Sequence, residues 1–303
     1  MSRFSQDKRK AEEAWSSYHP EPLGDFGSVD SLSILPLSDW YADCDDLVGE
    51  AGVSYLLRAD DKQLLFDTGA NWKKEEPSPL LRNMKELGVT VDSLDAVVIS
   101  HTHCDHTGGM DAMRAKTFVL SPSDPDLTGL TVYVPSALTH PTANVVLTEE
   151  PKVIFPGVCT IGVIWRALWL LGLTPEQALA VNVRGKGIVL IIGCGHQGLS
   201  RILKRTSQLF SEPLYGVFGG LHYPVTASRT KGFVSQRVMG TGKLPWQRIT
   251  REEVDDAVDL LATAAPSLVG LSAHDSCDWS VNHFREAFGD RYRDIIVGRE
   301  ILV

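Results

Sequence analysis

The stretch Ser100-His101-Thr102-His103-Cys104-Asp105-His106-Thr107-Gly108-Gly109 is the part of the sequence from which the fold is best inferred. It follows Ala96-Val97-Val98-Ile99, a short β-branched apolar run that predicts a buried strand. The polar side chains would then lie on the turn after the strand, where the two glycines let the chain bend. Imidazole nitrogens and a carboxylate at this spacing are donors that zinc and related divalent ions prefer. The predicted metal ligands of this stretch are His101, His103, Asp105 and His106.

A second strand is predicted upstream, where the chain reads Leu64-Leu65-Phe66-Asp67-Thr68-Gly69. This segment and the HxHxDH motif of residues 101–106 together resemble the metallo-β-lactamase superfamily. The resemblance implies an α/β fold, a four-layer αββα sandwich of two similar halves with the metal site at their shared edge. It also implies that Asp67 supports the motif by contacting metal ligands rather than the metal itself.

Three predicted strands in the second half of the chain also end in a histidine, namely His196, His222 and His274. In layered α/β proteins, ligand sites form at the ends of strands. We therefore predict His196 and His274 as further metal ligands. The sequence leaves His222 as a metal ligand, a residue that contacts substrate or a structural residue, and we predict a catalytic role for it together with Asp105.

Two motifs make the resemblance more specific, Gly193-Cys194-Gly195-His196 and Gly219-Gly220-Leu221-His222. They are similar to a branch of the superfamily that includes the archaeal 7,8-dihydropterin-6-methyl-4-(β-D-ribofuranosyl)aminobenzene-5′-phosphate synthases. That branch has a terminal His-Cys pair, which is separated here in His274-Asp275-Ser276-Cys277. The substrate therefore stays open.

The chain also departs from the common hydrolases of the superfamily at two ligand positions. Pro175-Glu176-Gln177 stands where those enzymes carry Gly-His, and Gly193-Cys194 stands where they carry a metal-bridging aspartate. His196 would supply the missing imidazole. We expect Cys194 to lie beside the ligands, and either its thiol or a water would take the bridging place.

The composition of the 303 residues, 43% hydrophobic and 22% charged, is ordinary for a globular protein. A net charge of −9 argues against a nucleic-acid partner, and five scattered cysteines argue against a disulfide framework. The polar N-terminus has no signal-peptide core. The apolar run from Ile161 to Leu173 is 13 residues long and contains Arg166, so it predicts a core or partner-facing helix rather than a membrane span. We expect a cytoplasmic protein without a membrane partner. The sequence does not decide whether the protein forms a homo-oligomer.

The predicted organisation is an N-terminal extension (1–28) and a single domain (29–303) with an inserted basic loop at about 224–249. Between residues 229 and 251 the chain has six basic residues and no acidic one. We predict that this loop is a lid whose Arg237 and Lys243 bind an anionic substrate. The alternative is a solvated loop that does not bind substrate. After it, Thr250 and Glu253 predict a capping box at the start of a helix.

These features favour a metal-dependent hydrolase that acts on a small anionic substrate through a metal-bound hydroxide, with a phosphorylated substrate favoured. One or two divalent ions are expected, with Zn²⁺ preferred and Mn²⁺ or Fe²⁺ left open. Two alternatives remain. One is a pterin-type synthase or transferase in which the metals hold a diphosphate leaving group, and the other is a non-catalytic, metal-dependent ligand sensor.

Overall fold

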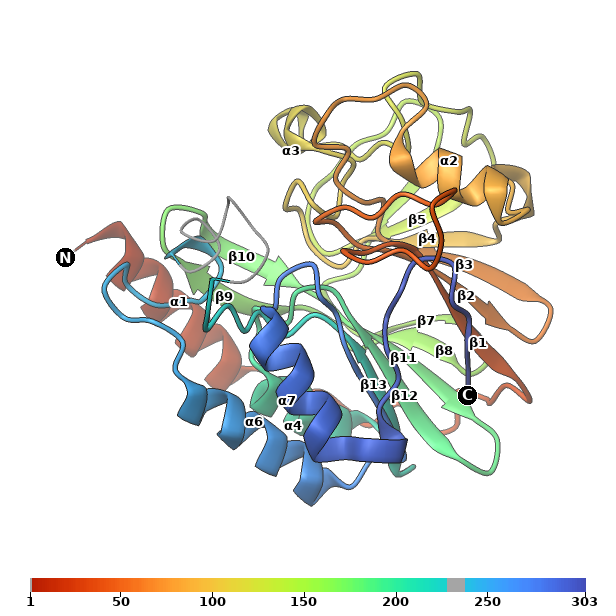
Figure 1. Ribbon diagram of the computed structural model, residues 1–303. Coiled ribbons are helices and arrows are strands. Elements are labelled where there is room, and N and C mark those ends of the chain that lie inside the picture. The colour runs from red at the N-terminus through yellow and green to blue at the C-terminus, as the bar shows by residue number, and fades with distance from the viewer. Residues whose placement is uncertain (1, 228–237) are drawn as a thin grey trace.

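The computed structural model describes residues 2–227 and 238–303. In this part of the chain two large sheets lie face to face, and helices cover their outer faces (Figure 1). The predicted four-layer αββα sandwich is therefore confirmed. None of the described helices combines the length and the apolar character that crossing a bilayer requires.

The first sheet is built mainly from the N-terminal half of the chain. Its strands, in spatial order, are β15 (Ile301–Leu302), β1 (Leu32–Ser38), β2 (Ser54–Ala59), β3 (Lys62–Phe66), β4 (Ala96–Val98), β5 (Thr131–Val134) and β6 (Asn144–Leu147). β3 and β4 are parallel, with Phe66 opposite Val98. The loop after β3 and the metal motif after β4 consequently leave the sheet at the same edge.

The second sheet is built from the C-terminal half. Its strands, in spatial order, are β14 (Leu268–Leu271), β13 (Leu214–Gly219), β12 (Gly187–Ile192), β11 (Leu179–Val183), β8 (Val158–Thr160) and β7 (Lys152–Phe155). β12, β13 and β14 are mutually parallel. The segments that carry Cys194, His222 and His274 therefore begin at one edge of this sheet, as the sequence predicts.

Helices lie on both outer faces of the sandwich (Figure 1). α2 (Pro79–Glu86) packs on the first sheet, and α3 (Met110–Ala115) lies on the same side. The second sheet is covered by α4 (Leu199–Leu209), α6 (Arg251–Ala264) and α7 (Asp278–Phe288). Single 3-10 turns occur at η1 (Val91–Ser93) and η2 (Gly289–Arg291). The predicted capping box of α6 is confirmed, because Thr250 Oγ1 accepts the Glu253 N–H and the Glu253 carboxylate accepts the Thr250 N–H.

Strand periodicity divides the core into three layers. Neighbouring residues of β4 point to opposite faces, so that Val98 packs between the sheets and Val97 packs under α2. In β12, Val189 likewise faces the first sheet, whereas Leu190 faces the helices. All four side chains are buried, and this burial fixes the register that brings the strand ends together.

The prediction of a helix between Ile161 and Leu173 is wrong. This segment belongs to a two-stranded hairpin of β9 (Ile164–Leu168) and β10 (Gly172–Glu176). The turn needs left-handed backbone at Leu170 (φ +67°) and Gly172 (φ +82°), which ends any helix there. A continuous apolar run does not distinguish a buried strand pair from a helix.

The N-terminal extension contains the predicted helix, α1 (Arg3–Ser17), which packs against β9 and β10 (Figure 1). Trp15 anchors it to α4, because the guanidinium groups of Arg201 and Arg205 lie 5.2 and 5.6 Å from the ring centroid. Both carboxylate oxygens of Glu12 accept hydrogen bonds from Arg201 at 2.6 Å. α1 is thus attached to the second half of the sandwich.

The inserted basic loop is described only in part. Arg237 and the rest of residues 228–237 lie outside the described residues, so the lid and the role of Arg237 remain predictions. Lys243 is described, and its Nζ lies 2.5 Å from the Glu253 carboxylate and 3.1 Å from the Arg248 carbonyl oxygen. Its ammonium group is therefore held at the start of α6.

Candidate metal centre

Three imidazoles form one group of donor atoms at the edge between the sheets. His103 Nδ1 lies 3.0 Å from His101 Nε2 and 3.2 Å from His196 Nε2. His101 and His103 come from the loop after β4, and His196 comes from the loop after β12. Two strand ends, one from each sheet, therefore bring the three side chains together.

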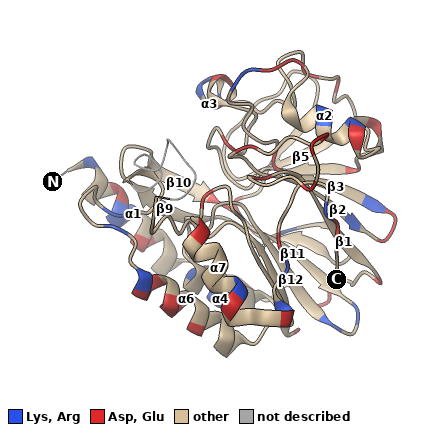
Figure 2. Cartoon of the chain, in the orientation of Figure 1, with Lys and Arg blue, Asp and Glu red and all other residues tan. Residues whose placement is uncertain are grey.

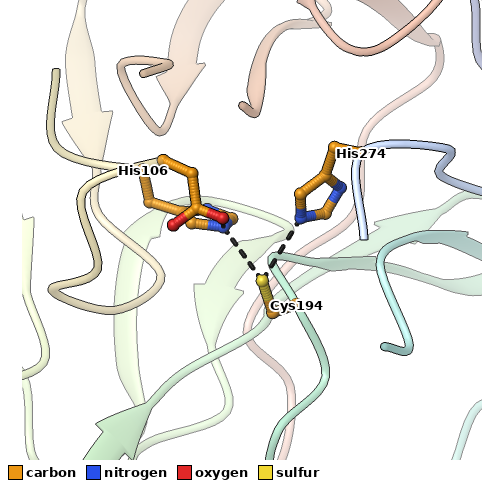
Figure 3. Close-up of side chains that lie close together, drawn as sticks. His106, Cys194 and His274 are labelled. Atoms are coloured by element: carbon orange, nitrogen blue, oxygen red, sulfur yellow. Dashed lines mark hydrogen bonds and ion pairs between the residues drawn. The ribbon is translucent and has the colours of Figure 1, made fainter. Parts of the chain in front are cut away.

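A second group of donors lies directly beside the first and contains Asp105, His106, Cys194 and His274. Cys194 Sγ lies 3.1 Å from His106 Nε2 and 3.2 Å from His274 Nε2 (Figure 3). Asp105 Oδ2 lies 3.7 Å from His106 Nε2. Cys194 Sγ also groups with His101 and His196, so one thiol is shared by both sets of donors.

Asp67 fixes the orientation of the first-half histidines. Its Oδ2 accepts a hydrogen bond from His106 Nδ1 at 2.7 Å and from Ser100 Oγ at 2.7 Å. Because the Ser100 hydroxyl donates to the carboxylate, it accepts from His101 Nδ1 at 3.0 Å. In the neutral form both rings then carry the proton on Nδ1, and the Nε2 lone pairs point into the donor groups. This is the orientation that metal ligands require.

Asp39 orients His274, the histidine from the second half of the chain, through Ser272. The sequence analysis did not predict this role. Ser272 Oγ donates to Asp39 Oδ2 at 2.5 Å and accepts from His274 Nδ1 at 2.6 Å. Tyr55 Oη donates to the same carboxylate at 2.8 Å. Asp39 belongs to no motif in the sequence, and its contact with Ser272 joins residues 233 positions apart.

His196 is oriented by a carbonyl group from the described end of the insertion. Its Nδ1 donates to Gly240 O at 2.8 Å, which leaves Nε2 facing His103. A Cβ on Gly240 would lie 2.0 Å from the ring of His222, so only glycine permits this approach. The chain after the insertion therefore packs directly on the donor groups.

The protonation of the cluster follows from burial and neighbouring charge. Burial lowers the pKa of His103 to about 4 and holds the pKa values of His101 and His196 well below the ordinary value. These rings are neutral at pH 7, the form that binds metal. Burial also disfavours charge on His106, but Asp105 and Asp67 outweigh it and raise the pKa of that ring to about 9. A cation at the second group would compete with this proton.

Comparison with known proteins agrees with this arrangement. Residues 47–194 match the family model of the metallo-β-lactamase superfamily. The crystal structure of Tm1679, a metal-dependent hydrolase of the β-lactamase superfamily, aligns with a TM-score of 0.58 over 90% of this chain and 99% of that chain, at 19% identity. The chain is a metallo-β-lactamase-fold protein. The metallo-β-lactamase fold protein YhfI from Bacillus subtilis aligns with a TM-score of 0.54 over 90% of this chain and 100% of that chain, at 14% identity.

A similar sequence agrees with the predicted branch of the superfamily. The 7,8-dihydropterin-6-methyl-4-(β-D-ribofuranosyl)aminobenzene-5′-phosphate synthase of Methanocaldococcus jannaschii is 26% identical over 245 residues. The alignment covers 66% of this chain and 80% of that protein. The resemblance that the second-half motifs indicated is thereby confirmed, while the reaction of this metallo-β-lactamase-fold protein stays open.

His222 lies at the side of the donor groups, 5.0 Å from His196 between ring centroids. Its backbone is left-handed (φ +56°), a conformation that costs free energy for a histidine and is held by surrounding contacts. One such contact is the His222 N–H, which donates to Asp275 Oδ2 at 2.9 Å, while Nδ1 lies 3.8 Å from the same oxygen. The pair thus places an imidazole beside a buried carboxylate at the predicted catalytic position.

Glu176 is the last residue of β10 and stands at one of the positions where the sequence departs from the common hydrolases. Its Oε1 accepts the backbone N–H groups of Cys194 (3.0 Å) and Gly195 (2.8 Å). Burial raises the pKa of Glu176 to about 7, and these hydrogen bonds oppose the rise. Glu176 is completely buried and holds the turn that presents Cys194 and His196.

The structure brings together all six predicted metal ligands, His101, His103, Asp105, His106, His196 and His274. Asp67 contacts His106 as expected. The sulfur of Cys194 lies among the donor atoms, which is compatible with the bridging place that the sequence analysis left open between this thiol and a water. Lys243 pairs with Glu253 instead, so its role in substrate binding stays a prediction.

Proposed function

We propose that this protein is a metal-dependent hydrolase that acts on a small anionic substrate, with a phosphorylated substrate favoured. The observation that carries this proposal is the position of Cys194 Sγ, shared by two adjacent sets of donors. Adjacent sets of this kind suit two ions that flank one reacting group. The buried imidazoles are oriented by Asp67, Asp39 and Gly240, which supports a preformed site.

The donor set fits divalent ions of the zinc type. Imidazole nitrogens, one carboxylate and one thiolate suit Zn²⁺ or Fe²⁺ better than the oxygen-preferring Mn²⁺. His101, His103 and His196 would hold one ion, and Asp105, His106 and His274 would hold another, with Cys194 between them. Such ions would lower the pKa of a bound water and stabilise negative charge on the group under attack.

His222 is the residue that we propose to move a proton. It lies beside the donor groups, and neither of the two sets above includes it. Its ring also forms a further set of possible ligands with Cys194 and Asp275. Asp275, whose pKa is raised by burial, lies 3.8 Å from its Nδ1 and would hold the ring in place. The imidazole would then protonate the leaving group, a contribution of about 10²–10⁴-fold in rate.

A synthase reaction is the second candidate, and the 26% identity with the Methanocaldococcus jannaschii protein favours it. In that case the same donors would bind a diphosphate leaving group. The sensor alternative drew its support from missing ligands. His196 and Cys194 lie among the donor atoms of the cluster, which favours the hydrolase over the sensor.

Metal analysis together with a substrate screen tests the proposal. We expect two ions per chain and turnover of one class among phosphate monoesters, phosphodiesters and lactones. His103→Ala and Asp105→Asn should abolish turnover. Cys104→Ala is the matched control in the same loop, because burial raises the pKa of that thiol to about 12 and keeps it protonated.

Full activity in His103→Ala or Asp105→Asn would contradict metal-dependent chemistry. Turnover of a dihydropterin diphosphate, with none of the hydrolytic substrates, would instead support the synthase. The variant His222→Asn tests whether His222 transfers a proton or has only a structural role. It should lower kcat and remove one limb of the pH profile while KM and the metal content stay unchanged.

A further inference from the structure

A cleft of about 910 Å³ lies between α1 and the chain that leads into α6. Its charged lining residues are Lys8, Arg9, Glu12, Arg166 and Lys243. Figure 2 shows both basic and acidic residues along α1. None of the donor residues of the metal centre lines this cleft, so it is a separate site.

Most charges of the cleft already have partners. Arg9 lies 3.5 Å from Glu13, and Lys243 lies 2.5 Å from Glu253. Both oxygens of Glu12 are taken by Arg201. Arg166 differs, because among residues 2–227 and 238–303 its guanidinium forms neither a hydrogen bond nor an ion pair.

Arg166 is half-buried and lies near a second guanidinium, that of Arg201. Burial and the charge of Arg201 lower the pKa of Arg166, and only Glu12 opposes them. Arg201 Nη1 is itself buried without a hydrogen-bond acceptor in the described part of the chain. Both oxygens of Glu12 bind Arg201, so Arg166 has no acceptor of its own among the described residues. Of these two residues only Arg166 lines the cleft, and a phosphate group there would supply acceptors in the geometry that a guanidinium prefers.

An apolar cleft of about 480 Å³ adjoins the basic one and shares Phe4, Ser5 and Leu244 with it. Trp246 and Leu170, at its rim, are 74% and 68% exposed. Exposed large apolar side chains beside a cationic pocket suit a ligand with an aromatic body and an anionic end.

We propose that this double cleft binds an aryl phosphate, with the phosphate on Arg166 and Lys8 and the ring against Trp246 and Leu170. The cleft also borders the segment that orients His196, a predicted metal ligand. A Cβ on Gly242 would lie 2.6 Å from Arg166 Nε, and two residues earlier Gly240 accepts the hydrogen bond from His196. A ligand in the cleft therefore contacts the segment that orients His196.

Calorimetric titration of phenyl phosphate into the full chain tests this site, once with bound metals and once after chelation. We expect one equivalent of phenyl phosphate to bind to the chain, and we expect this binding to persist after the metals have been chelated. Arg166→Gln should weaken it by about tenfold or more, the effect of losing a charge-assisted hydrogen bond. Arg184→Gln is the matched control, since it alters an exposed guanidinium paired with Asp30 and should leave binding unchanged.

Titration with inorganic phosphate distinguishes the contribution of the basic cleft from that of the apolar cleft. Trp246→Ala should weaken phenyl phosphate but not inorganic phosphate. Unchanged binding in Arg166→Gln would overturn the site, and so would complete loss of binding in a chelated chain whose circular dichroism stays native. If chelation unfolds the chain, the comparison is made with metal-loaded proteins, and one equivalent of phenyl phosphate must bind to Arg166→Gln about tenfold more weakly than to the wild type. No turnover is measured, so a failure of the proposed hydrolase reaction leaves this test intact.

Discussion

At the scale of single residues, Asp39 determines which nitrogen of His274 carries the proton. The Asp39 Oδ1 atom accepts the backbone N–H groups of Trp40 and Ala273, so an asparagine there would turn its amide nitrogen toward Ser272. Ser272 would then donate to His274 Nδ1 and place the ring proton on Nε2. We expect Asp39→Asn to lower metal affinity by about 10–100-fold, measured by chelator competition.

The control for this prediction is Asp43→Asn. Asp43 is an exposed carboxylate that pairs with Arg299 at 2.5 Å, far along the chain from any donor. Its loss should leave metal affinity unchanged. Equal metal affinity in Asp39→Asn and the wild type would show that the carboxylate does not set the tautomer of His274.

Asp39 also makes stability depend on pH. Burial raises its pKa from 3.8 to about 6, and the hydrogen bonds from Ser272 and Trp40 oppose the rise. Between these values the folded chain binds more protons than the unfolded chain, so the free energy of unfolding falls as the pH rises through that window. The loss is about 3 kcal/mol in order of magnitude.

Urea denaturation of chelated protein at pH 4 to 7 measures this effect. The wild type should lose stability relative to Asp39→Asn as the pH rises, because all other groups titrate in both proteins. Parallel pH profiles for the two proteins would contradict the raised pKa.

A spectroscopic prediction tests whether Cys194 binds the metal directly or only lies beside the metal ligands. If its sulfur binds metal, cobalt-substituted protein should show thiolate-to-cobalt charge-transfer absorption, and Cys194→Ala should lose it. Cys104→Ala, in the adjacent loop, should keep the band. Retention of the band in Cys194→Ala would return Cys194 to the supporting role predicted from the sequence.

At the scale of elements, α1 is held by the contacts of Trp15 with the basic side chains of α4. We expect Trp15→Ala to lower the free energy of unfolding by about 2–3 kcal/mol, since it removes a partly buried ring and its cation–π contacts. Trp246→Ala is the control, because that ring is 74% exposed and should cost about 0.5 kcal/mol or less. Equal urea midpoints for the two variants would show that α1 is not fixed by Trp15.

Local patterns predicted some elements well and others poorly. β4 and α6 were predicted because each has a local signal that spans only a few residues, an apolar run for β4 and a capping box for α6. The hairpin of β9 and β10 was not, because its apolar run has no period and its turn uses Leu170 in a left-handed conformation that a leucine rarely adopts.

The same reason explains what was missed in the site. His101 to His106 form a local motif, whereas the bond between Ser272 and Asp39 joins residues 233 positions apart. The contact of Gly240 with His196 depends on how the chain returns after the insertion. Such contacts are set by packing, and the sequence carries no local signal for them.

At the scale of the whole molecule, the cluster of predicted metal ligands contains side chains from both halves of the sandwich. His101 and His106 follow a strand of the first sheet, whereas Cys194 and His274 follow strands of the second. Zn²⁺ should therefore stabilise the folded chain, by about 2.7 kcal/mol at a hundredfold excess over Kd. Urea denaturation with and without chelator measures the difference.

A double variant, His106→Ala with His274→Ala, is the control for this stabilisation. It removes one donor from each sheet and should respond less to Zn²⁺ than the wild type. If the metal-loaded and chelated wild-type proteins unfold at the same urea concentration, the ions do not hold the halves together.

The hydrogen bond from His196 to Gly240 has a consequence for how such proteins diverge. A predicted ligand of the cluster depends on a carbonyl from the insertion, so the insertion and the cluster must change together. A relative that shortens this segment needs another acceptor at the same point in space. Exchanging the insertion between relatives as a cassette should therefore alter metal preference as well as substrate range, and lineages that keep their metal should keep a glycine where this chain has Gly240.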